Sequence, residues 1–327
     1  MQQHVTPQCY MRGFRDPGVD ARMGAQVWAV DLKNETIKGK SPKGIAAISD
    51  YYKIQLSPDQ EPNQIFESEL GRIESNAAPL LVRLRDGCCR LSDSERSWLA
   101  VFMASLHART PSSRQNIDTL AQKMVESVFK RKVRASDFSH SFREANRGRD
   151  ISDARIEQLQ RLLIKPRIIP EFSLEQVLTI TSTLARMIFE MCWRFTIPPI
   201  GKHFITNDNP VVWYDGSAPA PLRHALASRN TILLFPVGPE VALVGSWSDR
   251  PDGYDRIDDK VTESINQWIV SSADRWIIAA RRDEAASSLC QWRAVKNRGV
   301  TLGPLQLETF EADCPQSRGF GIGAFFR

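Results

Sequence analysis

Apolar residues recur with a helical period through the middle of the chain. Between Glu61 and Arg85 they fall at spacings of three and four, which is the pattern of one buried helix face. The positions are Phe66, Leu70, Ile73, Ala77, Leu80, Leu81 and Leu84. Ser92 and Glu95 form a capping box, in which each side chain bonds to the other residue's backbone N–H. It predicts the start of a second apolar helix, which runs through Trp98–Met103.

Three more helices are expected before the pattern changes. Thr110-Pro111 closes the second helix and starts another that runs to about Phe129, because Thr caps helices and Pro suits the first helical position. A further helix covers residues 152–164. Ser173, with a Gln three residues later, caps a long buried helix that runs to Phe195.

Strand patterns occur at both ends of the chain. Gln26–Leu32 and Glu35–Lys40 flank a short turn and predict a β-hairpin. Strand patterns resume after a Pro-Pro-Ile-Gly breaker, at His203–Thr206, Val211–Tyr214, Thr231–Phe235, Val241–Gly245 and Trp276–Ala280. Helices over residues 258–272 and from the last strand to about Asn297 complete the pattern.

This order of elements predicts an α+β fold. Helices occupy the middle of the chain, so we expect a mainly helical core with a small antiparallel or mixed sheet built from N-terminal and C-terminal strands. We expect residues 1–327 to form a single compact domain. Its helical central part covers about 61–197, and its strand-rich C-terminal part covers about 200–327.

Composition and charge indicate a cytoplasmic protein with no membrane segment. Apolar residues make up 42% of the chain, which is ordinary for a globular protein. The most hydrophobic stretch, Leu174–Phe195, contains the charged residues Arg186, Glu190 and Arg194, which a membrane span would lack. The first residues lack the apolar stretch of a signal peptide, and the six cysteines have no zinc or disulfide spacing. The net charge of +5 includes short basic pieces, such as residues 130–134, that suit phosphate groups.

Familiar catalytic signatures do not occur. The sequence contains no Gly-x-Gly-x-x-Gly after a strand, no Walker loop, no His-Glu-x-x-His and no Gly-x-Ser-x-Gly. We therefore expect no nucleotide cofactor, no P-loop and no α/β-hydrolase triad.

A carboxylate edge is the first candidate for chemistry. Glu67 and Glu74 lie on the same border of the apolar stripe of the first long helix. Half-buried neighbouring carboxylates require an arginine, a metal ion or a proton, because each disfavours the charge of the other. The alternative is a purely structural ion pair with Arg72 or with an arginine from elsewhere in the chain.

Other candidates lie at helix ends and turns. Arg109 ends the second helix, where it either complements the helix dipole or reaches an acidic or phosphate site, and Arg114 could join it. Asp208 and Asn209 belong to an Asn-Asp-Asn-Pro turn between apolar strands. His4 stands alone near the N-terminus, and a lone histidine is more often structural than catalytic.

These candidates coincide with a resemblance to a bacterial family, domain of unknown function 4238. Members open with His-x-x-Pro-x-x-Tyr-Leu-x-x-Phe, matched here by His4, Pro7, Tyr10 and Phe14, the last one residue late. Further matching pieces are Val-Trp-Ala-Val-Asp, Phe-Glu-x6-Glu, Arg-Thr-Pro-x-x-Arg, Phe-Ile-Thr-x-Asp-Asn-Pro and Ser-Ile-Asn266, so the resemblance covers nearly the whole chain. Met11 and Asn207 replace the usual Leu and Ser. The resemblance implies no activity, but it selects the polar residues that belong together.

The function that we expect is a metal-dependent hydrolase of phosphodiester or nucleotide substrates, nuclease-like. Glu67, Glu74 and Asp208 would bind Mg²⁺ or Mn²⁺, and Arg109 would stabilise charge on a phosphate. His4 would act as general acid or base, Asn209 would complete the catalytic set, and Tyr10 and Arg114 would bind substrate. The alternative is a non-catalytic module for nucleic acid, a partner protein or a second copy, with a structural ion network. A toxin or phage-defence role is a third hypothesis.

Overall fold

The computed structural model describes most of the chain. The described residues are 2–4, 6–20, 26–45, 47–49, 65–88, 90–113, 115, 152, 170–215, 229–248 and 250–298. The chain divides into two compact units, Met1–Thr110 with Val177–Arg327 and Pro111–Gln176. The elements discussed below belong to the first unit, apart from the first turns of α7. The predicted helices over about 111–129 and 152–164 lie outside the described residues, except for a first helical turn at 111–113.

The α+β prediction is confirmed, and strands from the two ends of the chain share a sheet. This four-stranded sheet has the order β3-β2-β11-β6, with antiparallel neighbours throughout. Its strands are β2 (Val27–Asp31), β3 (Thr36–Lys40), β6 (Thr206–Asn207) and β11 (Trp276–Ala279). The predicted hairpin is the pair β2 and β3.

A second sheet of five strands contains only C-terminal strands, in the order β10-β5-β9-β8-β7. Its strands are β5 (Cys192–Ile197), β7 (Val212–Asp215), β8 (Thr231–Gly238), β9 (Val241–Ser246) and β10 (Gly253–Arg256). The β10–β5 pair is parallel and the other pairs are antiparallel. A small additional pair joins β1 (Gln2–His4) to β4 (Ala47–Ser49).

One predicted helix is wrong at both ends. Helix α7 covers Pro170–Glu190, so Ser173 lies inside it and is not its N-cap, and Cys192–Ile197 is strand β5. The helical central part therefore ends before residue 197. The apolar run continues across Met191, which hid the boundary, but β5 takes β9 and β10 as partners on its two sides. Sheet pairing thus overrides a pattern that suits a buried helix equally well.

The other long helices agree with the sequence pattern. Helix α2 (Ile65–Arg85) has the predicted buried face, and α3 (Asp93–Ala108) begins with the predicted capping box. Helix α8 (Asp259–Ser272) is capped by the side chain of Asp258, and α9 (Arg282–Arg298) follows β11. Within the described residues, none of these helices combines the length and the hydropathy needed to cross a lipid bilayer.

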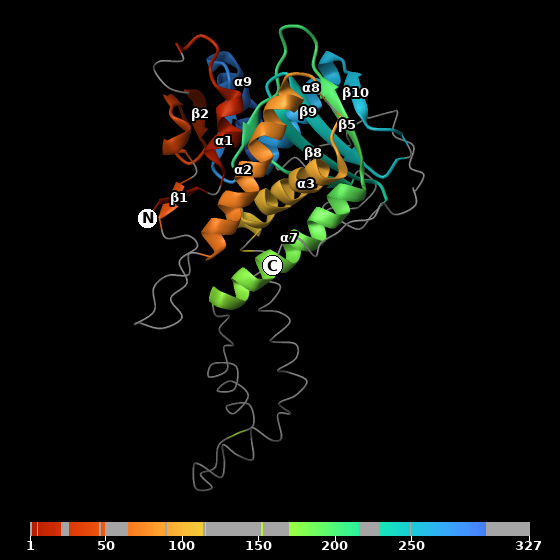
Figure 1. Cartoon of the computed structure of the whole chain (residues 1–327). Helices are drawn as coiled ribbons and strands as arrows, with labels where there is room; N and C mark the ends of the chain where they lie inside the picture. The colour runs from red at the N-terminus through yellow and green to blue at the C-terminus, as the bar shows by residue number, and fades with distance from the viewer. Residues whose placement is uncertain are drawn as a thin grey trace. The chain divides into compact units, whose positions relative to one another are not determined.

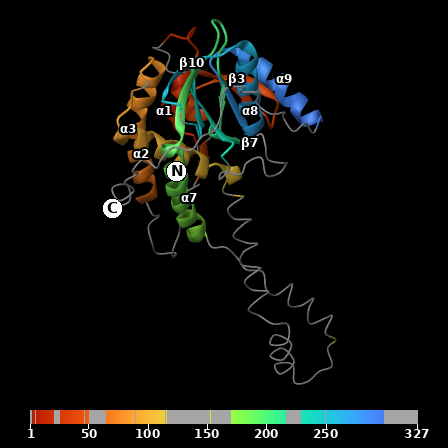
Figure 2. The same ribbon diagram turned by 90° about the vertical axis from the view of Figure 1, so that its right-hand side faces the viewer.

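The strands lie between two groups of helices. Figure 1 shows α2 and α3 side by side next to the strands, and Figure 2 shows α8 and α9 on the opposite side of the strands. Strand β8 illustrates the result, because Leu233 and Phe235 belong to the core under α2 and α3, whereas Leu234 belongs to the core under α8 and α9. The alternation of side chains along a strand thus supplies both cores.

The N-terminal segment is part of the first core. Pro7 caps helix α1 (Gln8–Met11), and the 3-10 helix η1 (Arg12–Phe14) follows it. Tyr10 is fully buried; its hydroxyl donates to the carbonyl of Pro236 and shares a hydrogen bond with Thr206 Oγ1, both at 2.6 Å. Its ring stacks on Phe235. This segment therefore links helices and both sheets.

Arg85, at the end of α2, fixes this segment in place. Its Nε donates to the carbonyl of Val237 at 2.7 Å and its Nη2 donates to the carbonyl of Tyr10 at 3.3 Å. The guanidinium lies against Gly13, where a Cβ would overlap it, and the stem of Arg85 lies against Gly238. Gly13 is thus required for space rather than for an unusual backbone angle.

We expect Gly13→Ala to destabilise the protein, because the added methyl group displaces Arg85 from two backbone carbonyls. The free energy of unfolding in urea should fall by about 1–3 kcal/mol, the cost of leaving buried polar groups without partners. The matched control is Gly44→Ala in the 3-10 helix η3 (Pro42–Gly44), where a Cβ would meet open space. Equal stability of the two variants would contradict this account of Arg85.

Candidate functional site

Arg109 and Glu74 form the centre of the candidate site. Arg109 is the C-cap of α3, and its Nη1 donates to Glu74 Oε1 at 2.9 Å. The Arg109 side chain is only 1% exposed, whereas that of Glu74 is 30% exposed. Arg72, the alternative partner for this carboxylate edge, forms an ion pair with Glu69. Two of the residues selected from the sequence, Glu74 and Arg109, are thus in direct contact.

Arg109 has donors that nothing in the described part of the chain accepts. Its Nε and Nη2 are buried and lack a hydrogen-bond partner there. Buried polar groups in folded proteins are nearly always hydrogen-bonded, and each exception calls for an explanation such as a bound ligand. A guanidinium offers donors in a planar fork that matches a carboxylate or a phosphate.

Cys9 is a neighbour of this pair that the sequence analysis did not select. Burial raises the pKa of the Cys9 thiol, the negative charge of Glu74 raises it further, and the positive charge of Arg109 opposes the rise. The thiol is therefore protonated at neutral pH and packs as a small apolar group. The one signal in the sequence was its place between Pro7 and Tyr10 in the opening motif.

The segment 206–212 brings the Asn-Asp-Asn-Pro turn to the N-terminal segment and to the end of α3. The hydroxyl of Thr6 donates to the carbonyl of Asp208 at 3.3 Å. The Nδ1 atom of His107 lies 3.3 Å from the carbonyl of Val211. Strands β6 and β7 belong to different sheets, so this turn is a crossing between sheets and not a hairpin.

The carboxylate of Asp208 accepts three backbone N–H groups. Asp274 N donates to Oδ1 at 2.9 Å, and Arg275 N and Trp276 N donate to Oδ2 at 2.9 and 3.0 Å. The backbone N–H of Asp208 donates in turn to the carbonyl of Trp276. Asp208 therefore holds the start of β11 beside β6. Burial raises its pKa to about 7 and the charge of Asp274 acts in the same direction, whereas the three N–H groups lower it.

Asn207 and Asn209 complete the turn. Asn207 Nδ2 donates to the carbonyl of Ile269 and to Ser272 Oγ, so it fastens the turn to α8. Asn207 Oδ1 accepts the backbone N–H of Asn209 at 2.8 Å, which is an Asx turn. The predicted turn residues thus bind mainly to the surrounding backbone.

For several of the other residues selected from the sequence, the structure describes only the main chain or nothing. The main chain of His4 lies in β1 and that of Glu67 in α2, but both side chains lie outside the described residues, as does the whole of Arg114. Tyr10 fills the core and its hydroxyl is occupied by Thr206 and Pro236. In the part of the chain that the structure describes, no three His, Cys, Asp or Glu side chains are grouped as metal ligands.

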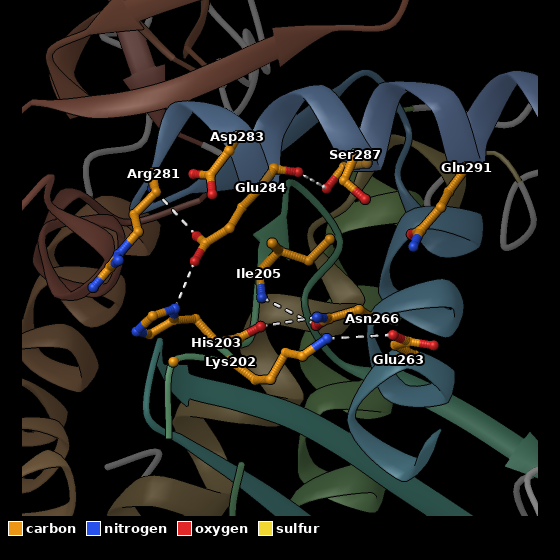
Figure 3. Close-up of a pocket in the computed structure, with 12 residues that line it drawn as sticks. Lys202, His203, Ile205, Glu263, Asn266, Arg281, Asp283, Glu284, Ser287 and Gln291 are labelled. Carbon is orange, nitrogen blue, oxygen red and sulfur yellow. Dashed lines mark hydrogen bonds and ion pairs between the residues drawn. The ribbon is translucent and has the colours of Figure 1, made fainter. Parts of the chain in front are cut away.

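A pocket lies elsewhere in the first unit, between the N-terminal part of α9, helix α8 and the segment before β6. Its volume is about 330 Å³, and its lining includes Lys202, His203, Glu263, Asn266 and Glu284. Figure 3 shows the side chains of α9 along one wall and those of α8 and the 202–205 segment along the facing wall. The sequence analysis assigned no site to these residues, because the pocket combines three separate segments.

The raised pKa of Asp208 predicts a pH dependence of stability. The unfolded chain releases this proton near pH 3.8 and the folded chain near pH 7, so the folded state binds more protons between these values. The contribution of Asp208 to stability is complete below pH 3.8 and is lost as pH rises to 7. At about 1.4 kcal/mol per pKa unit, the loss is on the order of 4 kcal/mol.

Urea unfolding from pH 4 to pH 8 tests this expectation. The free energy of unfolding of the wild type should fall with pH relative to that of Asp208→Asn, which has no proton to release. Asp86→Asn, at an exposed position, should follow the wild type. Parallel pH profiles for the wild type and Asp208→Asn would show that folding does not change the pKa of Asp208.

Among the comparisons with known proteins, one gives a match, which is to a family model. Neither the curated proteins nor the solved structures contain a match to this chain. A family model matches residues 2–283 and thereby includes the opening motif, Glu74, Arg109 and the Asn-Asp-Asn-Pro turn. The chain belongs to the family described as protein of unknown function, DUF4238.

Proposed function

We propose that this protein is a hydrolase of phosphodiester or nucleotide substrates that binds a phosphate group of the substrate at Arg109. The observation that carries the proposal is the buried guanidinium with two nitrogens, Nε and Nη2, that no described residue accepts from. Arginine recognises phosphate through two parallel N–H···O bonds, and charge-assisted bonds of this kind are among the strongest in proteins.

The position of Arg109 supports a role in binding rather than in structure alone. A cation at the C-terminus of α3 is favoured by the helix dipole, but the dipole does not require the side chain to be buried. A buried ion pair is stable only when its other hydrogen-bonding groups are satisfied. Glu74 accepts the hydrogen bond from Nη1, and the proposal assigns the N–H groups of Nε and Nη2 to a ligand.

Glu74 has the exposure that a metal ligand or a general base needs. Its side chain is 30% exposed, and only its Oε1 atom accepts from Arg109. Carboxylate oxygens are the usual ligands of Mg²⁺ and Mn²⁺. The proposal therefore assigns the metal ion to Glu74, with Glu67 two turns earlier on α2 as its second ligand. A metal ion held there would supply Lewis-acid activation of water for the hydrolysis. Arg109 would stabilise the charge on the phosphate oxygens while water replaces the leaving oxygen on phosphorus.

The other members of the predicted set receive supporting roles in this proposal. Asp208 already accepts three backbone N–H groups, so we assign it a positioning role: its carbonyl accepts from Thr6 and holds the N-terminal segment that carries His4. His4 would protonate the leaving oxygen, which completes the hydrolysis. Asn209 would contact the substrate beside Arg109.

The cellular setting is part of the same proposal. The basic pieces of the chain and a phosphate site suit nucleic acid or nucleotides as substrates, and we place the protein in the bacterial cytoplasm. A toxin or phage-defence role would appear as growth inhibition on expression, lost in His4→Ala.

The test is hydrolysis of bis(p-nitrophenyl) phosphate, single-stranded RNA and single-stranded DNA with added Mg²⁺ or Mn²⁺. We expect Glu74→Gln and Arg109→Lys each to lower the rate by about a hundredfold, the usual cost of removing one group that stabilises the transition state. Glu69→Gln is the matched control, because Glu69 forms a partly exposed ion pair with Arg72 on the same helix. Equal activity of the wild type and Glu74→Gln would refute the site.

Thermal unfolding distinguishes this function from a structural ion pair in a non-catalytic module. Inorganic phosphate and Mg²⁺ should raise the melting temperature of the wild type, because a ligand that binds only the folded state stabilises it. The effect of phosphate should disappear in Arg109→Lys and persist in Glu69→Gln. If Glu74→Gln melts at a much lower temperature and neither ion stabilises the wild type, the pair is structural.

A further inference from the structure

The pocket between α8 and α9 is lined mainly by polar side chains. Of the described side chains that line it, only Ile205 is apolar. Drug-like and lipid ligands bind mostly through apolar walls, so a pocket of this volume with a polar lining suits a polar ligand. This pocket shares no residue with the Arg109 site.

The lining of the pocket carries charges of both signs. Glu263, Asp283 and Glu284 oppose an anion, and Lys202 and Arg281 oppose a cation. Lys202 is already partnered, since its Nζ lies 3.4 Å from Asp259 Oδ2 and 3.5 Å from Glu263 Oε1. A ligand without net charge meets no such opposition.

The groups that remain for a ligand include both hydrogen-bond donors and acceptors. His203 Nδ1 is held by Glu284 Oε1 at 2.7 Å, which leaves Nε2 without a partner among the described residues. Glu284 is itself engaged by the backbone N–H of Arg281. Ser287 and Gln291 add a hydroxyl and an amide, which both donate and accept, along the same wall as Asp283 (Figure 3).

Asn266 gives the facing wall a fixed shape. Its Nδ2 donates to the carbonyl of His203 at 2.9 Å, and its Oδ1 accepts the backbone N–H of Ile205 at 3.1 Å. The irregular segment before β6 is thereby bound to α8 on both sides of Phe204. The position of the His203 ring is thus set before any ligand binds, which lowers the entropic cost of binding.

We propose that this pocket binds a small, uncharged, polyhydroxylated molecule: a free sugar or the ribosyl part of a nucleoside. Each hydroxyl group donates one hydrogen bond and accepts up to two, so a set of neighbouring hydroxyls matches a wall that offers carboxylate acceptors together with hydroxyl and amide groups. The carboxylate of Asp283 and the amide of Gln291 each suit two adjacent hydroxyls. The site stands independently of the hydrolase proposal.

Isothermal titration calorimetry of the full chain with ribose, glucose and adenosine tests the proposal, with alanine and inorganic phosphate as comparison ligands. We expect binding of at least one hydroxylated probe. Asp283→Asn and Gln291→Ala should each weaken that binding about fivefold, which corresponds to one lost hydrogen bond. A preference for adenosine over ribose and glucose identifies the nucleoside as the source, and the reverse identifies a free sugar.

The chain offers a matched control for each variant. Asp93→Asn removes an exposed carboxylate from the first turn of α3, as Asp283→Asn does from α9, so both lose the same interaction with a helix dipole. Gln267→Ala changes an exposed glutamine on α8 outside the pocket. Both controls should bind like the wild type. The proposal is overturned if none of the three hydroxylated probes binds, or if the pocket variants bind them as tightly as the controls do.

Discussion

Three backbone N–H groups at the start of β11 converge on the carboxylate of Asp208, and much of the structure depends on this contact. Asp208 lies where the chain leaves the four-stranded sheet at β6 and enters the five-stranded sheet at β7. Such a crossing ends the ladder of backbone hydrogen bonds inside the protein, where unpaired groups are costly. Asp208 supplies acceptors for β11, and its own carbonyl accepts from Thr6 in the N-terminal segment.

The side chains around this crossing follow the same rule. Asn266 satisfies the backbone on both sides of Phe204, Asn207 binds α8, and Arg85 supplies donors for the carbonyls of Tyr10 and Val237. Polar residues at these positions are therefore explained by the fold without any reference to a ligand. Arg109 differs, because two of its buried nitrogens have no acceptor in the described part of the chain. That contrast, rather than the presence of charge, separates the candidate site from the structural network.

Local rules in the sequence predicted helix α2 and the start of α3. The capping box at Ser92 and the period of α2 depend on residues within one helix, and both were found in the structure. Strand β5 could not be predicted in this way, because Cys192–Ile197 becomes a strand only through its partners β9 and β10. The separation of β6 and β7 into two sheets was hidden for the same reason. Patterns within a segment do not determine the partners of that segment.

The candidate site shows the same division between local and long-range information. Glu74 lies on the edge of a helix and Arg109 at a helix end, so each was selected from its own surroundings, and the family motifs joined them to one set. Their contact required α2 to pack against α3, and the proximity of Cys9 required the N-terminal segment to pack beside them. The pocket at His203 and Glu284 offered no comparable signal, because each residue is ordinary in its own segment. Only the pairing of the two across α9 and the segment before β6 makes them part of a site.

The two candidate sites are connected by one short piece of chain. Residues 203–211 begin at the pocket, where His203 contacts Glu284, and end at α3, where Val211 contacts His107 two residues before Arg109. Between these points Asn207 and Asp208 fasten the segment to α8 and β11. A segment held at so many points has little freedom to move as a loop. The fixed geometry of both sites therefore follows from the hydrogen bonds that the crossing between the two sheets requires.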